Sequence, residues 1–438
     1  MGVSARLGTP MTLTRRDLLR LAGLGAAGFA AGPAGCGDNV PFRAAGGEHA
    51  AIILEPDATS FIVSVWSRTA KAVAIEVQGS GGVVFESVAL VDRAQQAAID
   101  VTDLEPGQHY QVVITSDDGV RMGPHHVQTA PRIDDTRPVR IAVSADIDPH
   151  PDFISDLLEH VANASPELFV SLGDFPYADN GPGPAMTVDE YRDRHVQART
   201  DPRIRRWLET VGIRGIYDDH EFRNDWDAQY RESEASRYAA AMQVWDEMFP
   251  LRSTSGEVRY RSWRWGAHLE CFLLDCRRFR SANAMPDSET KTMLGATQHA
   301  WLLEGLQRST APFKLVFTSV PLDYGDGDDH WAAFSVERDA LLRSMVGIGG
   351  VLFVSGDQHV FGAHRHAHGV REMQVGPLSR GVGDPQRTAP GVLFRSARMN
   401  CGLVDVDGSS LTFSAVGTDG EVFYKETFSV ADLTAVAQ

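Results

Sequence analysis

Five apolar runs in this chain end on side chains that can bind a metal ion. The segments that follow these runs are Asp146, Gly173-Asp174, Asp218-Asp219-His220-Glu221, Asp275 and Gly356-Asp357-Gln358-His359. A phenol, Tyr177, stands three residues beyond Asp174. One such ending would be a helix cap or a solvated turn, but five in the same relative place indicate a shared site. If the runs are neighbouring strands, their ends place all of these groups in one cleft.

Carboxylates, imidazoles and a phenolate are ligands for hard cations, with the phenolate favouring a trivalent metal. Two cations about 3.5–4 Å apart can clamp both the attacking and the leaving oxygen of a phosphoryl transfer. The chain has a net charge of −17 and would repel a phosphate ester unless cations are bound. The same charge disfavours nucleic acid, and we predict no nucleic-acid-binding module.

The residues from 139 to 430 alternate apolar runs with helical patterns. The helical patterns lie at 153–164, 191–211 and 297–309. This alternation predicts an α/β layered domain with two sheets or one large sheet. The strands of such a domain position a site at their C-terminal ends.

Residues 51–131 carry short alternating runs separated by turn residues, which predicts an all-β sandwich with a structural role. Leu104 to Ile114, LEPGQHYQVVI, resembles the tyrosine corner of fibronectin type III domains, with Tyr110 at the corner. Trp66 is expected in the core of this sandwich. A Gly/Ala-rich tether is predicted over 37–50, and a Pro- and charge-marked linker over 131–138.

Residues 1–36 resemble a twin-arginine signal peptide, because Arg15-Arg16 precede a Gly/Ala-rich apolar stretch. The alternatives are a membrane anchor or a chance Arg pair, but the stretch is short and Gly-rich for a stable span. PAGC at 33–36 resembles a lipoprotein cleavage box with Cys36 as the lipidated residue, although Pro33 is unusual there. We therefore expect the twin-arginine export machinery as a partner. The product would be periplasmic, a cell-surface lipoprotein or secreted.

The order D…GDxxY…DDHE…LDxR…GDxH resembles metallophosphatases of the alkaline phosphatase D (PhoD-like) family, relatives of purple acid phosphatases. DDHE, LDCRRFR, KTMLGATQHAWL and SGDQH carry the resemblance, which covers about 45–430. It implies a four-layer α/β/β/α sandwich preceded by a small fibronectin III/Ig-like sandwich. It also implies an exported, metal-dependent phosphoesterase. Such an enzyme hydrolyses phosphate monoesters, diesters or both by a metal-bound hydroxide at a multinuclear site.

The resemblance also implies the ligands of two metals, Fe³⁺ and Ca²⁺. The Fe³⁺ ligands would be Asp146, Asp174, Tyr177 and His359. Asp174 would bridge to Ca²⁺, whose other ligands would be Asp219, Asp357 and, as a weaker candidate, Asn224. Asp146 departs from the family, which typically has a cysteine there. A carboxylate is a harder ligand than a thiolate, so the identity of the bound metal stays open.

Four further residues receive roles beside the metals. His220 would donate a proton to the leaving group or stabilise its charge. Arg277 would clamp a phosphate, since a guanidinium matches phosphate oxygens in a fork, or else form a structural ion pair with Asp275. Glu221 is expected to orient His220, and Asp218 to cap or hydrogen-bond its turn.

Other segments receive plainer interpretations. Cys271, Cys276 and Cys401 are odd in number and lack a CxxC pair, so no disulfide framework or thiolate zinc site is predicted. His364, His366 and His368 resemble a metal-binding tract but are expected to be exposed rim residues. Residues 323–331 are expected to form a mobile loop over the site, with Trp331 as a substrate wall.

Two rival functions stay open for what we expect to be a monomer. One is a phospholipase D-like or polymer phosphodiesterase. The other is a cell-surface binding protein with an inert metallo-domain, against which the intact ligand set argues.

Overall fold

The computed structural model describes residues 43–44 and 47–437, apart from 154, 181–182, 253–257, 325–326 and 385–388. The predicted signal peptide, Cys36 and much of the predicted tether lie outside the described residues. Within the tether, Arg43–Ala44 form a short strand, β1, that pairs with the strand at Val120–Gln128. No helix in the described ranges is long and apolar enough to cross a membrane.

An all-β sandwich forms the N-terminal region. Its five-stranded sheet has the order β1-β8-β7-β4-β5, formed by β8 (Val120–Gln128), β7 (His109–Ser116), β4 (Ala72–Gly79) and β5 (Gly82–Leu90). The facing strands are β2 (His49–Leu54), β3 (Phe61–Ser67) and β6 (Gln96–Val101). The Tyr110 hydroxyl accepts a 2.9 Å hydrogen bond from the Glu105 amide, which is the contact of a tyrosine corner. The assignment to the fibronectin III class stays a prediction.

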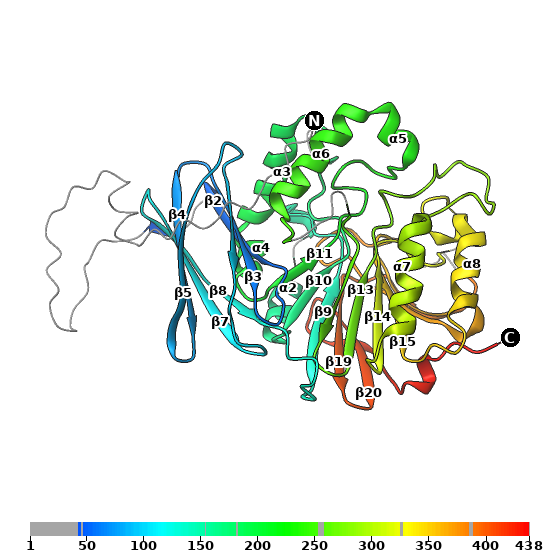
Figure 1. Ribbon diagram of the computed structural model, residues 1–438. Helices are drawn as coiled ribbons and strands as arrows, with labels where there is room; N and C mark the ends of the chain where they lie inside the picture. The colour runs from blue at the N-terminus through cyan, green and yellow to red at the C-terminus, as the bar shows by residue number, and fades with distance from the viewer. Residues whose placement is uncertain are drawn as a thin grey trace, which may run out of the picture.

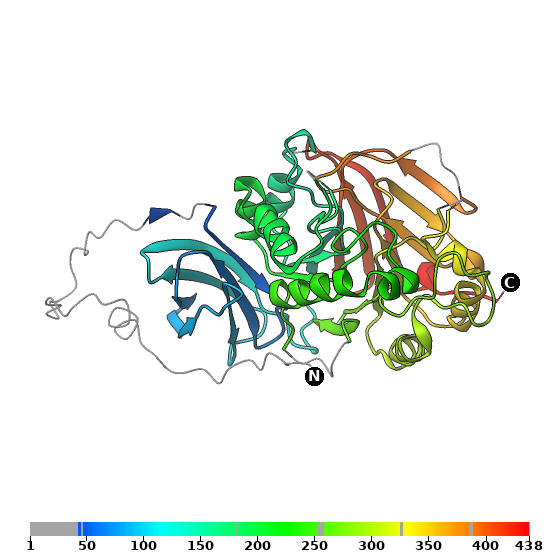
Figure 2. The same cartoon turned by 90° about the horizontal axis from the view of Figure 1, so that it is seen from above.

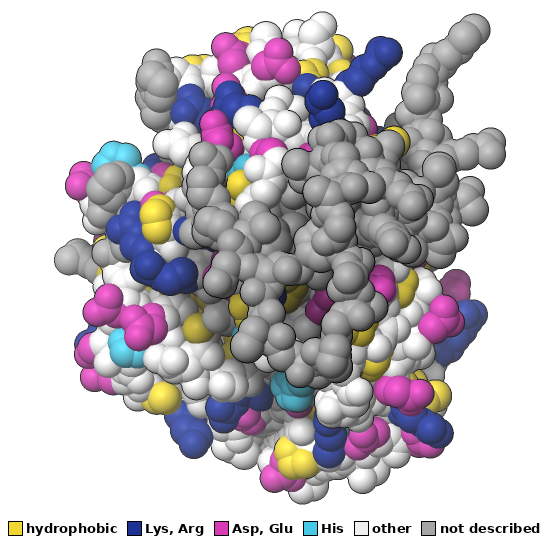
Figure 3. Space-filling model, turned by 90° about the vertical axis from the view of Figure 1, so that its left-hand side faces the viewer, with side chains coloured by type: hydrophobic (Ala, Val, Ile, Leu, Met, Phe, Trp, Pro, Cys, Tyr) yellow, Lys and Arg dark blue, Asp and Glu magenta, His cyan; other side chains and the backbone are white. Residues whose placement is uncertain are grey.

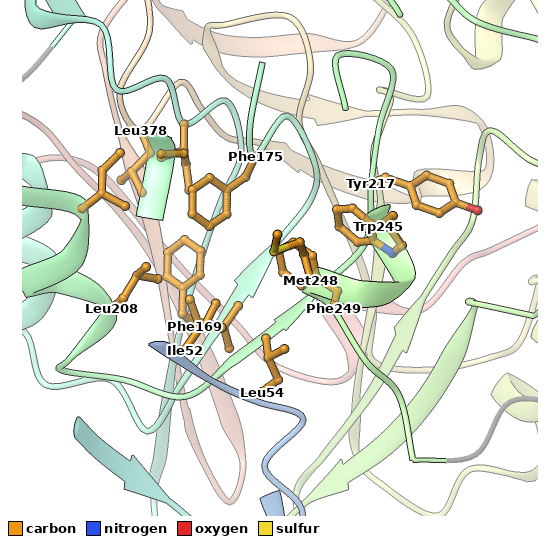
Figure 4. Packing of buried hydrophobic residues seen from close by; sticks show 14 of the residues in the cluster. Ile52, Leu54, Phe169, Phe175, Leu208, Tyr217, Trp245, Met248, Phe249 and Leu378 are labelled. Atoms are coloured by element: carbon orange, nitrogen blue, oxygen red, sulfur yellow. The ribbon is translucent and has the colours of Figure 1, made fainter. Parts of the chain in front are cut away.

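The sandwich is joined to the rest of the chain through a shared sheet. Leu54 of β2 pairs in parallel with Ile213 of β11 (Ile213–Gly215), so β2, β3 and β6 extend a nine-stranded sheet. Figure 4 shows Ile52 and Leu54 beside Phe169 within one hydrophobic cluster. Figure 3 shows the molecule from the end formed by the sandwich. On the coloured part of this face, acidic and basic side chains are mixed.

The prediction that Trp66 lies in the sandwich core is wrong. Side chains alternate along β3, and Phe61, Val63 and Val65 face the sandwich. Ile62 and Trp66 point the other way, into the cluster that contains Phe169 and the helices of the second region.

Two sheets pack face to face in the second region. The nine-stranded sheet has the order β21-β20-β19-β9-β10-β11-β2-β3-β6, with β9 (Val139–Ser144), β10 (Leu168–Ser171), β19 (Cys401–Asp407), β20 (Ser410–Val416) and β21 (Val422–Phe428). The seven-stranded sheet has the order β12-β13-β14-β15-β17-β16-β18. Its strands are β12 (Arg261–Trp265), β13 (Leu269–Leu273), β14 (Phe313–Thr318), β15 (Val351–Ser355), β16 (Phe361–Arg365), β17 (Arg371–Gln374) and β18 (Val392–Ser396). Val143, Val170, Leu315 and Val354 belong to the core between them.

Helices cover the outer faces of both sheets (Figures 1 and 2). Beside the nine-stranded sheet lie α2 (Leu157–Asn163), α3 (Val188–Thr200), α4 (Pro202–Leu208) and α6 (Ala235–Met248), the last preceded by α5 (Ala228–Ser233). Against the seven-stranded sheet lie α7 (Gly295–Arg308) and α8 (Ser335–Ser344). Short 3-10 turns occur at η1 (Pro151–Phe153), η2 (Trp331–Phe334), η3 (Ala367–Gly369) and η4 (Ala431–Leu433). The arrangement is a mixed α/β fold with helices outside two central sheets, as predicted.

The segment 323–331 does not provide a substrate wall. Trp331 is fully buried in the cluster of α7 and α8, and its Nε1 donates to Thr318 Oγ1 at 3.1 Å. An indole in an apolar cluster with its one donor satisfied is a core residue. Residues 325–326 of the predicted loop lie outside the described residues.

Candidate metal centre

The predicted ligands follow strands that run in parallel. In the nine-stranded sheet Ser144, Ser171 and Gly215 stand in one row across β9, β10 and β11. In the other sheet β13, β14 and β15 are likewise parallel neighbours. The C-terminal ends of both parallel sets lie at one edge of the fold, because Asp218 and Asp219 after β11 and Asp357 after β15 form one group of neighbouring carboxylates. Sites collect at such edges.

Several predicted ligands have a left-handed backbone, which is rare for residues other than glycine. They are Asp146 (φ 61°), Asp174 (φ 58°), Asp357 (φ 76°) and His359 (φ 55°). The glycine before Asp174 is required by space as well, because a Cβ on Gly173 would lie 2.5 Å from Asp218 Cβ. Strained backbone of this kind gathers at functional sites.

The ligand atoms form overlapping groups in which every atom lies within 4.8 Å of the others. One group is Asp146, Asp174 and His359, and a second is Asp174, Asp219 and His220. Asp174 is common to both, so two cation positions would share it. A third group joins Asp219 to Asp218 and Asp357. The Tyr177 hydroxyl lies 2.8 Å from His359 Nε2, beside the first group.

Buried oxygens without a partner test whether cations fit here. Both carboxylate oxygens of Asp146, Oδ2 of Asp174 and Oδ1 of Asp219 have no hydrogen-bond partner among the described residues. Burial, followed by repulsion from neighbouring carboxylates, raises the pKa of Asp146, Asp174 and Asp357 well above the usual range. Bound cations would supply the missing partners and remove the repulsion. The donor set therefore fits hard metal ions.

His220 is held by a residue that sequence reasoning missed. Its Nδ1 lies 2.7 Å from Asp179 Oδ1, and Asp179 Oδ2 accepts from the Asn224 amide at 2.7 Å. Burial lowers the pKa of His220, but Asp219 and Asp179 outweigh it and raise the value to about 9. The only signal in the sequence was an acid two residues after Tyr177. Asn224 itself is exposed.

Glu221 does not orient His220, contrary to the prediction. Its two oxygens accept from the backbone amides of Phe175 and Asp218, at 2.9 and 3.0 Å. This buried carboxylate therefore ties together the loops that carry Asp174 and Asp219. Burial raises the pKa of Glu221 to about 8, against the lowering effect of these two backbone donors.

Arg277 lacks the free guanidinium that a phosphate clamp needs, so that prediction is wrong. The side chain is fully buried and makes four hydrogen bonds, two to Asp218 and two to Asp329. The Asp275 carboxylate does not form an ion pair with the Arg277 guanidinium. Its oxygens accept from the Tyr217 hydroxyl at 2.5 Å and from the amides of Arg277 and Arg278. Arg277 instead fastens the loop after β11 to the other sheet.

Arg380 is a cation that lies beside the centre. Its guanidinium carbon lies 4.4 Å from the centre of the Tyr177 ring and 4.9 Å from that of Phe153, and Nη1 pairs with Asp148. The side chain keeps 23% of its surface exposed, next to His220 (16%) and His359 (21%). A partly exposed guanidinium anchored on one side can still donate to an anion on the other.

Comparison with known proteins identifies the family to which this chain belongs. The PhoD-like phosphatase family matches residues 151–400, which is more than half of the chain. PhoD-like phosphatases are phosphate-ester hydrolases. The chain belongs to this family, and the resemblance drawn from its motifs is confirmed.

Individual relatives agree at the level of family and fold. Alkaline phosphatase D of Bacillus subtilis (strain 168) is 25% identical over 248 residues, which are 46% of this chain and 42% of that protein. The chain thus matches less than half of the length of this relative. The structure of PhoD superposes with a TM-score of 0.76 at 17% identity, covering 87% of this chain and 90% of that one. A purple acid phosphatase from yellow lupin (Lupinus luteus) seeds superposes at 0.64 with 13% identity, over 87% and 75% of the two chains.

Proposed function

We propose that the protein is a metal-dependent phosphoesterase that hydrolyses phosphate monoesters, diesters or both. One observation carries the proposal. Asp174 belongs to two ligand groups at once, with Asp146 and His359 in one and Asp219 in the other, and buried oxygens in both groups lack hydrogen-bond partners among the described residues. A shared carboxylate between two cation positions is the arrangement that a two-metal phosphoryl transfer uses.

The residues divide into two ligand sets joined by Asp174. Asp146, Tyr177 and His359 would hold a trivalent metal, and Asp219 and Asp357 a divalent one, with Asn224 as a weaker ligand. When bound, the metals supply positive charge for the phosphate and lower the pKa of water. By family resemblance they are Fe³⁺ and Ca²⁺, while Asp146 in place of cysteine favours harder cations.

The remaining residues act on the substrate directly. His220 lies against the Tyr177 ring, with ring centres 4.3 Å apart, and presents the nitrogen not bonded to Asp179. Held as an imidazolium by Asp219 and Asp179, it would donate a proton to the leaving oxygen. Arg380 would donate to the non-bridging oxygens of the phosphate, the role first expected of Arg277.

Metal analysis and two chromogenic substrates test this proposal on the same sample. Protein loaded with iron and calcium is assayed with p-nitrophenyl phosphate and bis-p-nitrophenyl phosphate, and its metals are counted. We expect hydrolysis, bound iron, and a visible tyrosinate band that Tyr177→Phe removes. The ratio of the two rates separates a monoesterase from a diesterase.

Asp174→Asn is the decisive variant and Asp189→Asn its matched control, because Asp189 is 91% exposed on α3. Asp174→Asn should lose metal and activity together, and Asp189→Asn neither. A wild-type protein that binds no metal and hydrolyses neither substrate with any added cation would overturn the proposal. The rival function, a non-catalytic cell-surface binding protein, would then be favoured.

Export is a separate part of the proposal. Residues 1–36 would direct the folded protein through the twin-arginine machinery, with Cys36 as the lipid-bearing residue if the cleavage box is used. Replacing Arg15-Arg16 by Lys-Lys should retain the protein in the cytoplasm. Labelled palmitate should enter the wild type and not Cys36→Ala. Export that does not change with Lys-Lys would overturn the assignment.

A further inference from the structure

The prediction that His364, His366 and His368 are exposed rim residues is wrong for the first two. His364 is fully buried and His366 nearly so, on and just beyond β16. His364 stands opposite Glu372 of the antiparallel neighbour β17. The intervening Ala363 and Met373 belong to the core between the two sheets. His364 and Glu372 therefore lie on the opposite, outer face of the seven-stranded sheet.

These three side chains converge on one another. The rings of His364 and His366 are parallel within 5°, with centres 5.7 Å apart. His366 Nε2 lies 2.6 Å from Glu372 Oε2. One ligand atom from each of His364, His366 and Glu372 lies within 4.8 Å of the other two. A small movement of side chains would bring all three to the separations that a single bound cation requires.

The second observation is an unsatisfied buried imidazole. Neither ring nitrogen of His364 makes a hydrogen bond of ordinary geometry to the described residues, and the same holds for both atoms of the Gln374 amide. A Cβ at Gly362 would lie 2.4 Å from His364 Nε2 and 3.1 Å from Gln374 Oε1. Only glycine there lets these two polar atoms crowd the same space. Buried polar groups without partners are costly, so the cluster is built for an occupant.

The carboxylate is oriented as metal-binding carboxylates are. Glu372 Oε1 accepts from Ser355 Oγ at 2.6 Å and from the Leu322 amide at 3.0 Å. This leaves Oε2 directed at the histidines. Hydrogen bonds from behind fix the geometry of a ligand and are a regular feature of metal sites.

We propose that His364, His366 and Glu372 bind a transition-metal dication of the Zn²⁺ class, separately from the phosphoesterase centre. Two imidazoles and one carboxylate are borderline ligands that suit such an ion better than Ca²⁺. The Gln374 amide oxygen, or a water, would complete the coordination. The ion would be structural, joining β16 to β17 beneath the Leu322 loop. The proposal does not depend on the function assigned to the other site.

Counting bound metal tests the proposal without an activity assay. Full-length protein is stripped with a chelator, dialysed against Zn²⁺ or Co²⁺, and analysed for metal. Wild type should bind one equivalent more than His366→Gln or Glu372→Gln. The Co²⁺ absorption of a tetrahedral site should be lost in both variants. His368→Gln is the matched control, since that histidine belongs to the same tract but not to the ligand group.

A crystallographic arm removes any dependence on the folding of variants. Wild-type crystals soaked in Zn²⁺ should give an anomalous peak between the three side chains. No peak there, or equal metal content in wild type and the two ligand variants, would overturn the proposal and leave a buried water as the partner of His364.

Discussion

Asp179→Asn is the change that most directly tests how the site works. The residue lies outside the ligand groups, yet its carboxylate contacts the imidazole proposed to protonate the leaving oxygen. Asparagine keeps the size of the side chain and an acceptor for the Asn224 amide. The substitution therefore removes the negative charge of Asp179 beside His220, while that of Asp219 remains.

The expected loss follows from the contact itself. His220 Nδ1 and Asp179 Oδ1 are 2.7 Å apart, with side chains 16% and 9% exposed. A hydrogen bond to a charged group in such surroundings contributes about 1.5–3 kcal/mol. Because about 1.4 kcal/mol corresponds to a tenfold change in rate, kcat should fall about 10- to 100-fold. KM should change little, since Asp179 acts through His220 and does not itself touch the substrate.

A double-mutant cycle supplies the assay. Steady-state kinetics with p-nitrophenyl phosphate are measured for wild type, Asp179→Asn, His220→Asn and the double variant at equal metal content. If Asp179 acts only through His220, Asp179→Asn should have no further effect once His220 is absent. Equal losses in both backgrounds, or an unchanged kcat in the single variant, would refute this account of the pair.

Three further changes have separate readouts. Arg380→Met should raise KM about tenfold through loss of a charge-assisted contact, more for a monoester dianion than for a diester, whereas Arg308→Met, 79% exposed, should not. Arg277→Met should lower the free energy of unfolding in urea by about 3–5 kcal/mol, because two buried carboxylates lose their partner. For Glu55, burial raises the pKa, but arginines led by Arg261 outweigh it and hold the pKa below 4.5. Its stabilising contribution should be full above pH 4.5 and be lost as pH falls through the folded-state value, so wild type and Glu55→Gln should converge in acid.

The clustering of the candidate ligands could be predicted because their chemistry and their place in the chain coincide. A carboxylate after a buried strand has few structural uses, and parallel strands bring their ends to one edge. Side-chain pairing follows no such rule. Arg277 and Arg380 are the same residue type near the same centre, and only the fold shows that one is enclosed by Asp218 and Asp329. Asp179 was missed for the same reason, since its partner is 41 residues away.

The sequence did not predict that the sandwich and the second region share a sheet, because the apolar pattern of β3 is compatible with two different packings. Alternation in FIVSVWS separates Phe61, Val63 and Val65 from Ile62 and Trp66, but both sets are apolar. A sandwich standing alone would leave one face of such a strand to water and carry polar residues there. The burial of every residue of β2 and β3 therefore means that each of these strands has a second partner. Trp66 is one sign of this second partner, because its side chain packs from the outer face of the sheet into the cluster around Phe169. The sandwich therefore shares the nine-stranded sheet with the second region and is not a separate module attached to it.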